Sequence, residues 1–232
     1  MKTRVLTIAA LIPMLAVAAC DTVEMNGPGT GGTNNTATVR FVNATGTGLD
    51  LAQNGSVGTG MGNIVYGGST SCFTVNSSSP NLSVRNAGGT TTISGLTTNF
   101  QPGGTYTVLA YPSASGATQF AVLPNTFTPT SGQAGLRVFN ATGSGSYDIY
   151  TAASGGSFVT PSATAVNSGT ASSFFNVAPG TGAQLRISNA GTTTSALTLN
   201  NLTWTPGQTQ TLIIAPPATG STTPRTFLVS GC

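Results

Sequence analysis

The sequence predicts an all-β protein: two tandem Ig-like, antiparallel β-sandwich domains that follow a lipoprotein signal peptide and a flexible tether. The first observation is a repeat, because VRFVNATGTG at 39–48 returns as LRVFNATGSG at 136–145. The second is composition, since only 5% of the residues are charged and much of the polarity comes from Thr, Ser and Asn. The third is the distribution of turn-forming residues: 31 Gly and 13 Pro separate short segments rich in Thr and aromatic residues, which favour strands.

Residues 1–20, MKTRVLTIAALIPMLAVAAC, are typical of a signal peptide. Lys2 and Arg4 make its start positive, and the uncharged apolar stretch that follows is shorter than the ~20 residues of a membrane-spanning helix. The closing Val-Ala-Ala-Cys resembles a bacterial lipobox, in which the cysteine thiol receives a diacylglycerol and the cysteine becomes the new N-terminus. We therefore predict lipidation at Cys20; ordinary secretion and a buried N-terminal helix are the alternatives.

Residues 21–36 are rich in Gly, Asn and Thr and have no periodic apolar pattern. Such a composition predicts a flexible tether that holds a folded body near a membrane surface.

Two β-sandwich domains are predicted at 37–123 and 134–232, with a linker at 124–133. The repeat continues beyond its opening phrase, for example as LSVRNAG and LRISNAG, with small insertions between matching blocks. A period of about 100 residues is too long for a solenoid unit and suits a sandwich of seven or eight strands. In the first repeat, strands are expected near 37–43, 48–53, 61–66, 70–75, 81–86, 91–99, 104–111 and 117–123.

Three blocks of the first repeat form a recognisable pattern: VRFVNA at 39–44, LSVRNAG at 82–88 and PGGTYTV at 102–108. This pattern resembles a DUF4397 domain. The resemblance extends over 37–123 and 134–229, and it implies tandem β-sandwiches in a secreted bacterial protein. Gly and Thr replace the proline-rich turn that usually follows the family's first strand. The family has no established activity, so the resemblance implies a fold and no substrate.

The residue types exclude most familiar active sites. The sequence contains no histidine, which removes Ser-His-Asp and Cys-His catalysis and the usual zinc sites. The carboxylates inside the domains, Asp50 and Asp148, occupy equivalent positions and form no acidic cluster suited to calcium. We therefore predict no enzyme activity, no catalytic residues, no metal site and no cofactor.

Arg40 and Arg137 are also equivalent, and each lies shortly before the aspartate of its repeat. Alternation places Arg40 on the same strand face as Val42, partly buried and in need of a partner. The sequence therefore predicts structural ion pairs, Arg40 with Asp50 and Arg137 with Asp148, across the first hairpin of each repeat. Contact with a ligand is the alternative.

Aromatic residues are the remaining candidates for ligand contact. Trp204 is the only tryptophan, and Phe100 takes its place in the first repeat, so both are expected to fill cores. Tyr150 has no aromatic counterpart and is the better candidate for an exposed, stacking ring.

The three cysteines predict one disulfide. If Cys20 carries lipid, Cys72 and Cys232 remain, and an even remainder usually pairs in the oxidising compartment of an exported protein. A Cys72–Cys232 bond would join the end of the second repeat to the first. The alternative is a buried free Cys72 and an unpaired, mobile Cys232.

These features predict a non-enzymatic lipoprotein, a structural or adhesion module that is lipid-anchored in the cell envelope. The predicted location is the outer membrane, the cell surface or the periplasmic face of a membrane. The alternative function is a glycan or small-ligand binding protein that uses loops at one end of a β-sandwich. The expected partners are the membrane, through the lipid anchor, and envelope proteins or glycans. Nucleic acid is excluded because, beyond Lys2 and Arg4, the charges nearly cancel and no basic stripe exists.

Overall fold

In residues 35–217 and 221–232, the regular structure consists of strands, as predicted, arranged in four sheets of four strands each. A computed structural model describes residues 35–217 and 221–232. The predicted signal peptide, the predicted lipidation site Cys20 and nearly all of the predicted tether lie outside these residues. Within the described ranges, no helix is long and apolar enough to cross a membrane.

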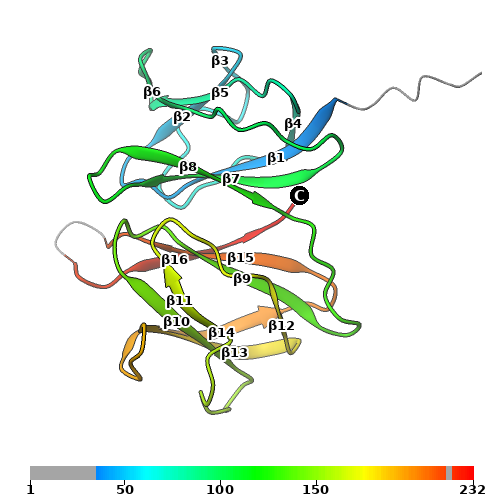
Figure 1. Cartoon of the computed structure of the whole chain (residues 1–232), viewed down its shortest axis with the longest axis vertical. Coiled ribbons are helices and arrows are strands. Elements are labelled where there is room, and N and C mark those ends of the chain that lie inside the picture. Colours follow the sequence, from blue (N-terminus) through cyan, green and yellow to red (C-terminus); the bar gives the residue numbers. More distant parts are fainter. Residues whose placement is uncertain (1–34, 218–220) are drawn as a thin grey trace, which may run out of the picture. The chain divides into compact units, whose positions relative to one another are not determined.

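The first sandwich contains β1 to β8, in two sheets with the strand orders β4-β1-β7-β8 and β3-β2-β5-β6 (Figure 1). Its core lies between the sheets and includes Val39, Phe41, Leu51, Val84 and Val108. The strands are β1 (Thr36–Asn43), β2 (Leu49–Gln53), β3 (Ser56–Val57), β4 (Phe73–Asn76), β5 (Leu82–Asn86), β6 (Thr92–Gly95), β7 (Thr105–Pro112) and β8 (Thr118–Pro124).

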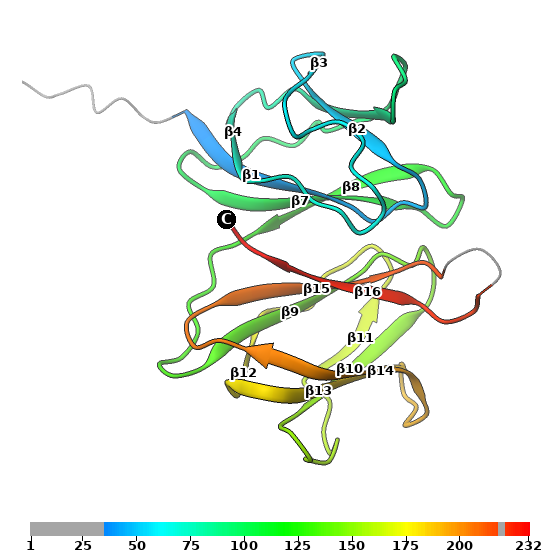
Figure 2. The same cartoon turned by 180° about the vertical axis from the view of Figure 1, so that it is seen from behind.

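The second sandwich repeats this arrangement, with the orders β12-β9-β15-β16 and β11-β10-β13-β14 (Figure 2). Its core includes Leu136, Val138, Ile149, Leu185 and Leu212. The strands are β9 (Ala134–Asn140), β10 (Ser146–Ala152), β11 (Ala163–Asn167), β12 (Phe175–Val177), β13 (Gly180–Asn189), β14 (Ser195–Trp204), β15 (Thr209–Ala215) and β16 (Arg225–Ser230). Matching strand orders are the structural counterpart of the sequence repeat.

Each sandwich is mixed, which corrects the expectation of purely antiparallel sheets. β1 pairs with β7 in parallel, and β9 pairs with β15 in parallel. The parallel pairs arise because β1 and β2 belong to different sheets, so the chain crosses between sheets and returns before β7 forms. The strand expected at 61–66 is also wrong: this segment is irregular and contributes a single bridge, Ile64 to Leu49.

A third apolar cluster, here called the junction cluster, contains residues from both sandwiches. Strand β9 explains this mixed membership. All of its residues are buried, but only one of its faces packs inside the second sandwich. Its other face, with Phe139, packs against side chains of β1, β7 and β8, and both sandwiches belong to one compact unit. The fully buried or nearly buried members of the cluster are Val42, Ala44, Leu109, Tyr111, Leu123, Phe139, Ala141, Ile213, Ala215 and Val229.

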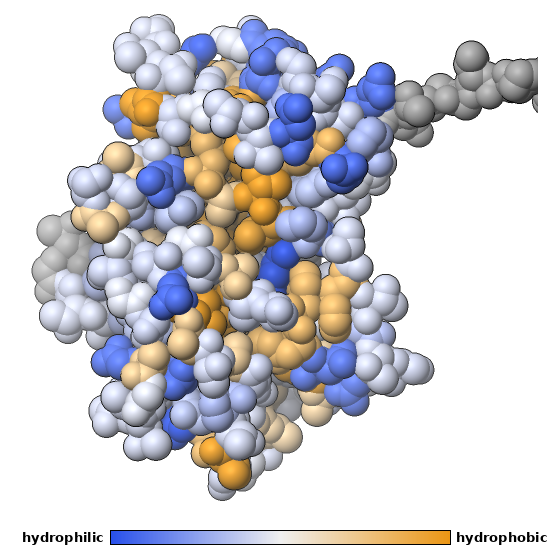
Figure 3. Space-filling view, viewed as in Figure 1, coloured by the Kyte–Doolittle hydropathy of each residue, from blue (hydrophilic) through white to orange (hydrophobic). Residues whose placement is uncertain are grey.

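The face shown in Figure 3 is pale over much of its area, with scattered strongly hydrophilic residues and with apolar residues gathered through its middle. This surface reflects a composition in which only 5% of the residues are charged.

Candidate functional site

The repeated Asn-Ala-Thr, at 43–45 and 140–142, forms a turn after the first strand of each sandwich. Asn43 is fully buried and donates to the carbonyl oxygens of Thr47 and Ile64, at 2.7 and 2.8 Å. Its Oδ1 accepts from the backbone N–H of Thr45 at 2.8 Å. Asn140 makes the equivalent bonds in the second sandwich. The repeated asparagines therefore satisfy buried backbone groups and are structural.

The two aspartates hold neighbouring backbone segments to the strands that carry them. The Asp50 carboxylate accepts from the N–H of Asn63 at 2.6 Å and from the N–H of Gly88 at 2.8 Å. Asp148 accepts from the N–H of Ala165 in β11 and from the N–H of Gly191 in the turn after β13, both at 2.8 Å. Both side chains are buried, so their charge is compensated by backbone donors.

The predicted ion pairs, Arg40 with Asp50 and Arg137 with Asp148, are therefore wrong. Within the described ranges, both arginines donate to uncharged acceptors and both carboxylates accept from backbone N–H groups. The physical reason is topological: each arginine and its aspartate lie on strands of opposite sheets and are not hairpin neighbours. Arg40 does share a strand face with Val42, but that face meets the second sandwich.

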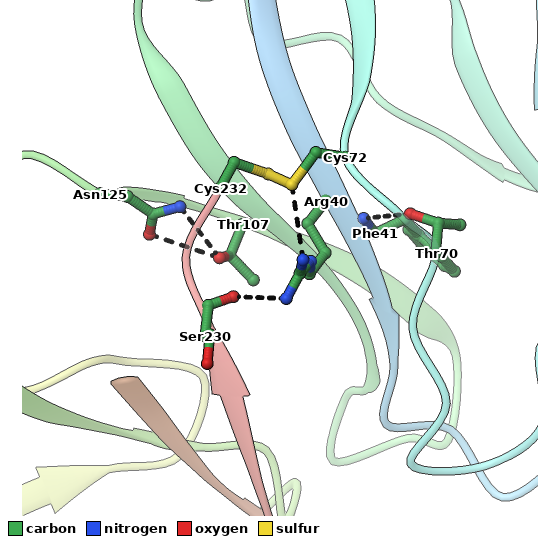
Figure 4. The surroundings of a disulfide bond; sticks show 8 residues. All are labelled: Arg40, Phe41, Thr70, Cys72, Thr107, Asn125, Ser230 and Cys232. Atoms are coloured by element: carbon green, nitrogen blue, oxygen red, sulfur yellow. Dashed lines mark hydrogen bonds between the residues drawn. A yellow bond between two sulfur atoms is a disulfide. The ribbon is translucent and has the colours of Figure 1, made fainter. Parts of the chain in front are cut away.

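The predicted disulfide between Cys72 and Cys232 is present, with Cα atoms 5.8 Å apart (Figure 4). Arg40 lies beside it and donates from Nη1 to the carbonyl oxygen of Ser230 at 2.8 Å. Its Nη2 donates to the sulfur of Cys72 at 3.5 Å. These four residues, here called the disulfide half of the junction, tie β1 of the first sandwich to the end of β16 in the second.

Arg137 occupies the equivalent position on β9 and is only 4% exposed. It donates to the carbonyl oxygen of Pro124 at 2.6 Å, to Oδ1 of Asn125 at 2.7 Å and to Oγ1 of Thr211 at 2.9 Å. Its guanidinium also lies over the ring of Phe174, 4.5 Å from the centroid. Burial lowers the pKa of Arg137 to about 10, because desolvation disfavours the charged form.

The two arginines make reciprocal contacts between the sandwiches. Thr107 pairs with Leu123 between β7 and β8, and Thr211 pairs with Val229 between β15 and β16. Consequently the residues that follow in each last strand, Pro124 and Ser230, are equivalent. Each arginine therefore reaches the end of the last strand of the other sandwich.

The position of Cys72 is filled by an aromatic residue in the second sandwich. Cys72 precedes Phe73, which pairs with Val39, and Phe174 precedes Phe175, which pairs with Leu136. Where Cys72 bonds to Cys232, Phe174 stacks on Phe127, with centroids 5.0 Å apart and an interplanar angle of 8°. Arg137, Phe174, Phe127 and Pro124 are here called the aromatic half of the junction.

Comparison with known protein families identifies a match to part of the chain. Residues 37–150 match the family described as "Domain of unknown function (DUF4397)". The chain contains a DUF4397 domain. The match covers the first sandwich except Thr36 and continues through β9 into β10. No curated protein matches the chain.

Aromatic residues of the DUF4397 sandwich and its repeat confirm one expectation and correct another. Phe100 and Trp204 are buried in equivalent cores, at 5% and 3% exposure, as predicted. Tyr150 was expected to be exposed, but it is only 6% exposed. The guanidinium of Arg186, its neighbour across the strands, lies 4.1 Å from its ring centroid and covers it.

Hollows flank the disulfide half of the junction. One, of about 190 Å³, is bordered by Cys232 together with Asn125, Gln208, Thr209, Ser230 and Gly231. Another, of about 140 Å³, borders Cys72. Across the described residues, no group of three or more His, Cys, Asp or Glu side chains lies together in a way that could hold a metal ion.

A larger hollow of about 310 Å³ is lined by Tyr66, Arg225 and Phe227. Tyr66 donates its hydroxyl to the carbonyl oxygen of Pro216 at 2.9 Å, and Arg225 lies 4.8 Å from its ring centroid. Burial raises the pKa of Tyr66, while the positive charge of Arg225 acts in the opposite direction. Sequence reasoning missed this group because its members lie in distant segments.

Proposed function

We propose that the protein is a non-enzymatic structural or adhesion module of the cell envelope, attached to a membrane through a lipid on Cys20. The observation that carries the proposal is the reciprocal junction, in which both arginines, the disulfide and the junction cluster hold two sandwiches together. A module that connects a membrane to something outside it must keep its shape under load. Fixing two domains to each other serves that purpose.

The use of the buried polar side chains also supports a structural role. Asp50 and Asp148 direct both carboxylate oxygens to backbone donors, and Arg137 directs its guanidinium to backbone and side-chain acceptors. A catalytic acid or base needs free access to a proton of the substrate. Side chains committed to loops and strands in this way stabilise the fold.

The proposal is tested in the organism that produces the protein. A deletion strain would be complemented with the wild-type gene, with Cys20→Ala or with a Cys72→Ser/Cys232→Ser variant, and surface adhesion and detergent sensitivity would be measured. We expect the wild type to restore both properties, the Cys20 variant to restore neither, and the disulfide variant to restore them in part. Full complementation by Cys20→Ala would contradict an anchored module.

A second candidate function, binding of a glycan or small ligand, is favoured by the hollow beside Tyr66, Arg225 and Phe227. Its volume falls at the lower end of the range for small-molecule sites, about 300–1,000 Å³. We therefore place the candidate binding site in this hollow, and no longer in loops at one end of a sandwich. The test is a glycan array probed with the mature protein and with Tyr66→Ala. Binding that the substitution abolishes would support this function, and retention of no glycan would end the proposal of a glycan ligand.

A further inference from the structure

We propose that the Cys72–Cys232 disulfide is a thiol-exchange site, at which a low-molecular-weight thiol becomes attached to Cys232 while Arg40 stabilises the departing thiolate of Cys72. This modification site goes beyond the structural role proposed above, which involves no chemistry at the disulfide. The inference rests on the access to the two sulfurs, on their different surroundings and on the uncompensated charge of Arg40.

Access is provided on both sides of the disulfide. Cys72 and Cys232 are both exposed residues. The hollow of about 190 Å³ beside Cys232 is lined mostly by polar residues, including Asn125 and Gln208. The hollow is open to solvent and lies beside Cys232, so a small thiol can approach this sulfur without displacing either sandwich.

The two sulfurs differ in their surroundings. Arg40 donates to the sulfur of Cys72, at 3.5 Å (Figure 4). A neighbouring positive charge favours the thiolate form of a cysteine, and a more stable thiolate leaves faster in exchange. Attack is therefore favoured on the sulfur of Cys232, with Cys72 as the leaving group.

Arg40 has the charge and the donors for this role. Since the predicted pair with Asp50 does not form, no carboxylate among the described residues neutralises its guanidinium. Its Nε is buried and has no hydrogen-bond partner within the described ranges. A thiolate formed at Cys72 would give this guanidinium an anionic acceptor.

The exchange is balanced without an external oxidant. An incoming thiolate attacks the Cys232 sulfur; one S–S bond forms between them as the Cys72–Cys232 bond breaks. The negative charge moves from the incoming sulfur to Cys72. The products are a mixed disulfide at Cys232 and a thiolate at Cys72 beside Arg40. The aromatic half and the junction cluster remain to hold the sandwiches together.

Reduced glutathione is the probe for the first experiment. The oxidised full chain, as isolated from its host, is exposed to glutathione for short times, quenched by rapid alkylation and mapped by mass spectrometry. We expect glutathione on Cys232 and the alkyl group on Cys72. Glutathione mainly on Cys72, or no mixed disulfide under conditions in which dithiothreitol reduces the bond, would overturn the proposal.

The second experiment tests the role of Arg40 as a positioning charge. Arg40→Gln should slow the glutathione reaction by about threefold or more, and Arg40→Lys should restore much of the rate. In a Cys232→Ser background, the pH profile of Cys72 alkylation should move upward by about one unit in Arg40→Gln. Arg85→Gln is the matched control, because Arg85 is also half-buried on a strand but donates to Gly55.

Equal rates and equal alkylation profiles for wild type and Arg40→Gln would refute the role of Arg40. Circular dichroism of each variant separates this outcome from unfolding, and the Arg40→Lys comparison is read only from variants with wild-type spectra. Because both experiments use purified protein, their outcome is independent of whether the envelope function is correct.

Discussion

The two halves of the junction hold the sandwiches together in different ways. In the disulfide half, Arg40 is only partly buried and the connection between sandwiches is covalent. In the aromatic half, Arg137 is 4% exposed, its donors are matched by protein acceptors, and a stacked aromatic pair replaces the disulfide. Equivalent backbone positions therefore stabilise the same kind of contact either through chain connectivity or through complete burial.

The difference shows what each solution requires. A buried charge without a counter-ion is tolerated only when its donors find acceptors, as those of Arg137 do in Pro124, Asn125 and Thr211. A disulfide has no such requirement, because in the chain-entropy model it stabilises the fold by restricting the unfolded chain. The four predictions that follow compare the halves, from the largest expected effect to the smallest.

Replacing both cysteines, Cys72→Ser/Cys232→Ser, should cause the largest loss of stability. The bond closes a sequence separation of 160 residues, and the chain-entropy model assigns such a loop about 5 kcal/mol. We expect a clearly lower midpoint in denaturant unfolding, with β-rich circular dichroism retained in its absence, because the junction cluster remains. Wild-type protein under excess reductant is the control and should match the variant. An unchanged midpoint would mean that the covalent link contributes nothing to the disulfide half.

Arg137→Ala should come second, at about 3 kcal/mol, because it leaves several buried acceptors without donors. Arg40→Ala is the matched variant and should lose about 1 kcal/mol, since Arg40 is partly solvated. Both values are measured by urea unfolding of the oxidised proteins. Equal losses at the two positions would show that burial does not distinguish the halves.

Phe174→Ala should destabilise by about 1–2 kcal/mol, because it removes the stack on Phe127 and the ring beneath the Arg137 guanidinium. A double-mutant cycle with Phe127→Ala measures the stack itself, for which we expect a coupling of about 1 kcal/mol. Additive losses would show that the two rings are neighbours without mutual stabilisation.

Tyr111→Phe should have the smallest effect, visible only at alkaline pH. Burial raises the pKa of Tyr111 above its ordinary value of 10.0. The unfolded chain therefore loses the phenolic proton first, and the tyrosine's contribution to stability is present below pH 10 and is lost as pH rises above it. Between about pH 9 and 11, the variant should lose less stability than the wild type. Parallel stability curves over this range would contradict the prediction.

Much of the fold could be predicted because the repeat, the turns and the strand composition all report local structure. The matching blocks reappear as equivalent strands, such as β1 and β9 or β5 and β13. The disulfide followed from cysteine counting, which requires no geometry. The parallel pairs were missed because a repeat shows which segments are equivalent and does not show which strands pair.

The junction was missed for a different reason, although a signal existed. The runs VLAY at 108–111 and LIIA at 212–215 are continuously apolar, as in strands buried on both faces. Alternation correctly placed Arg40 beside Val42, but it could not show that a second sandwich covers that face. The expected pairs with aspartate failed because closeness in sequence was taken for a hairpin, whereas the chain crosses to the opposite sheet.

The parallel pairing of β1 has a mechanical consequence. A pull transmitted along the chain to Thr36 acts along the axis of β1, which lies between β4 and β7. The force is then perpendicular to the hydrogen bonds of both neighbouring ladders. Many bonds therefore share the load and do not break one after another. Peeling a sheet edge would require far less force. The strand through which the chain enters the first sandwich is thereby placed to resist tension.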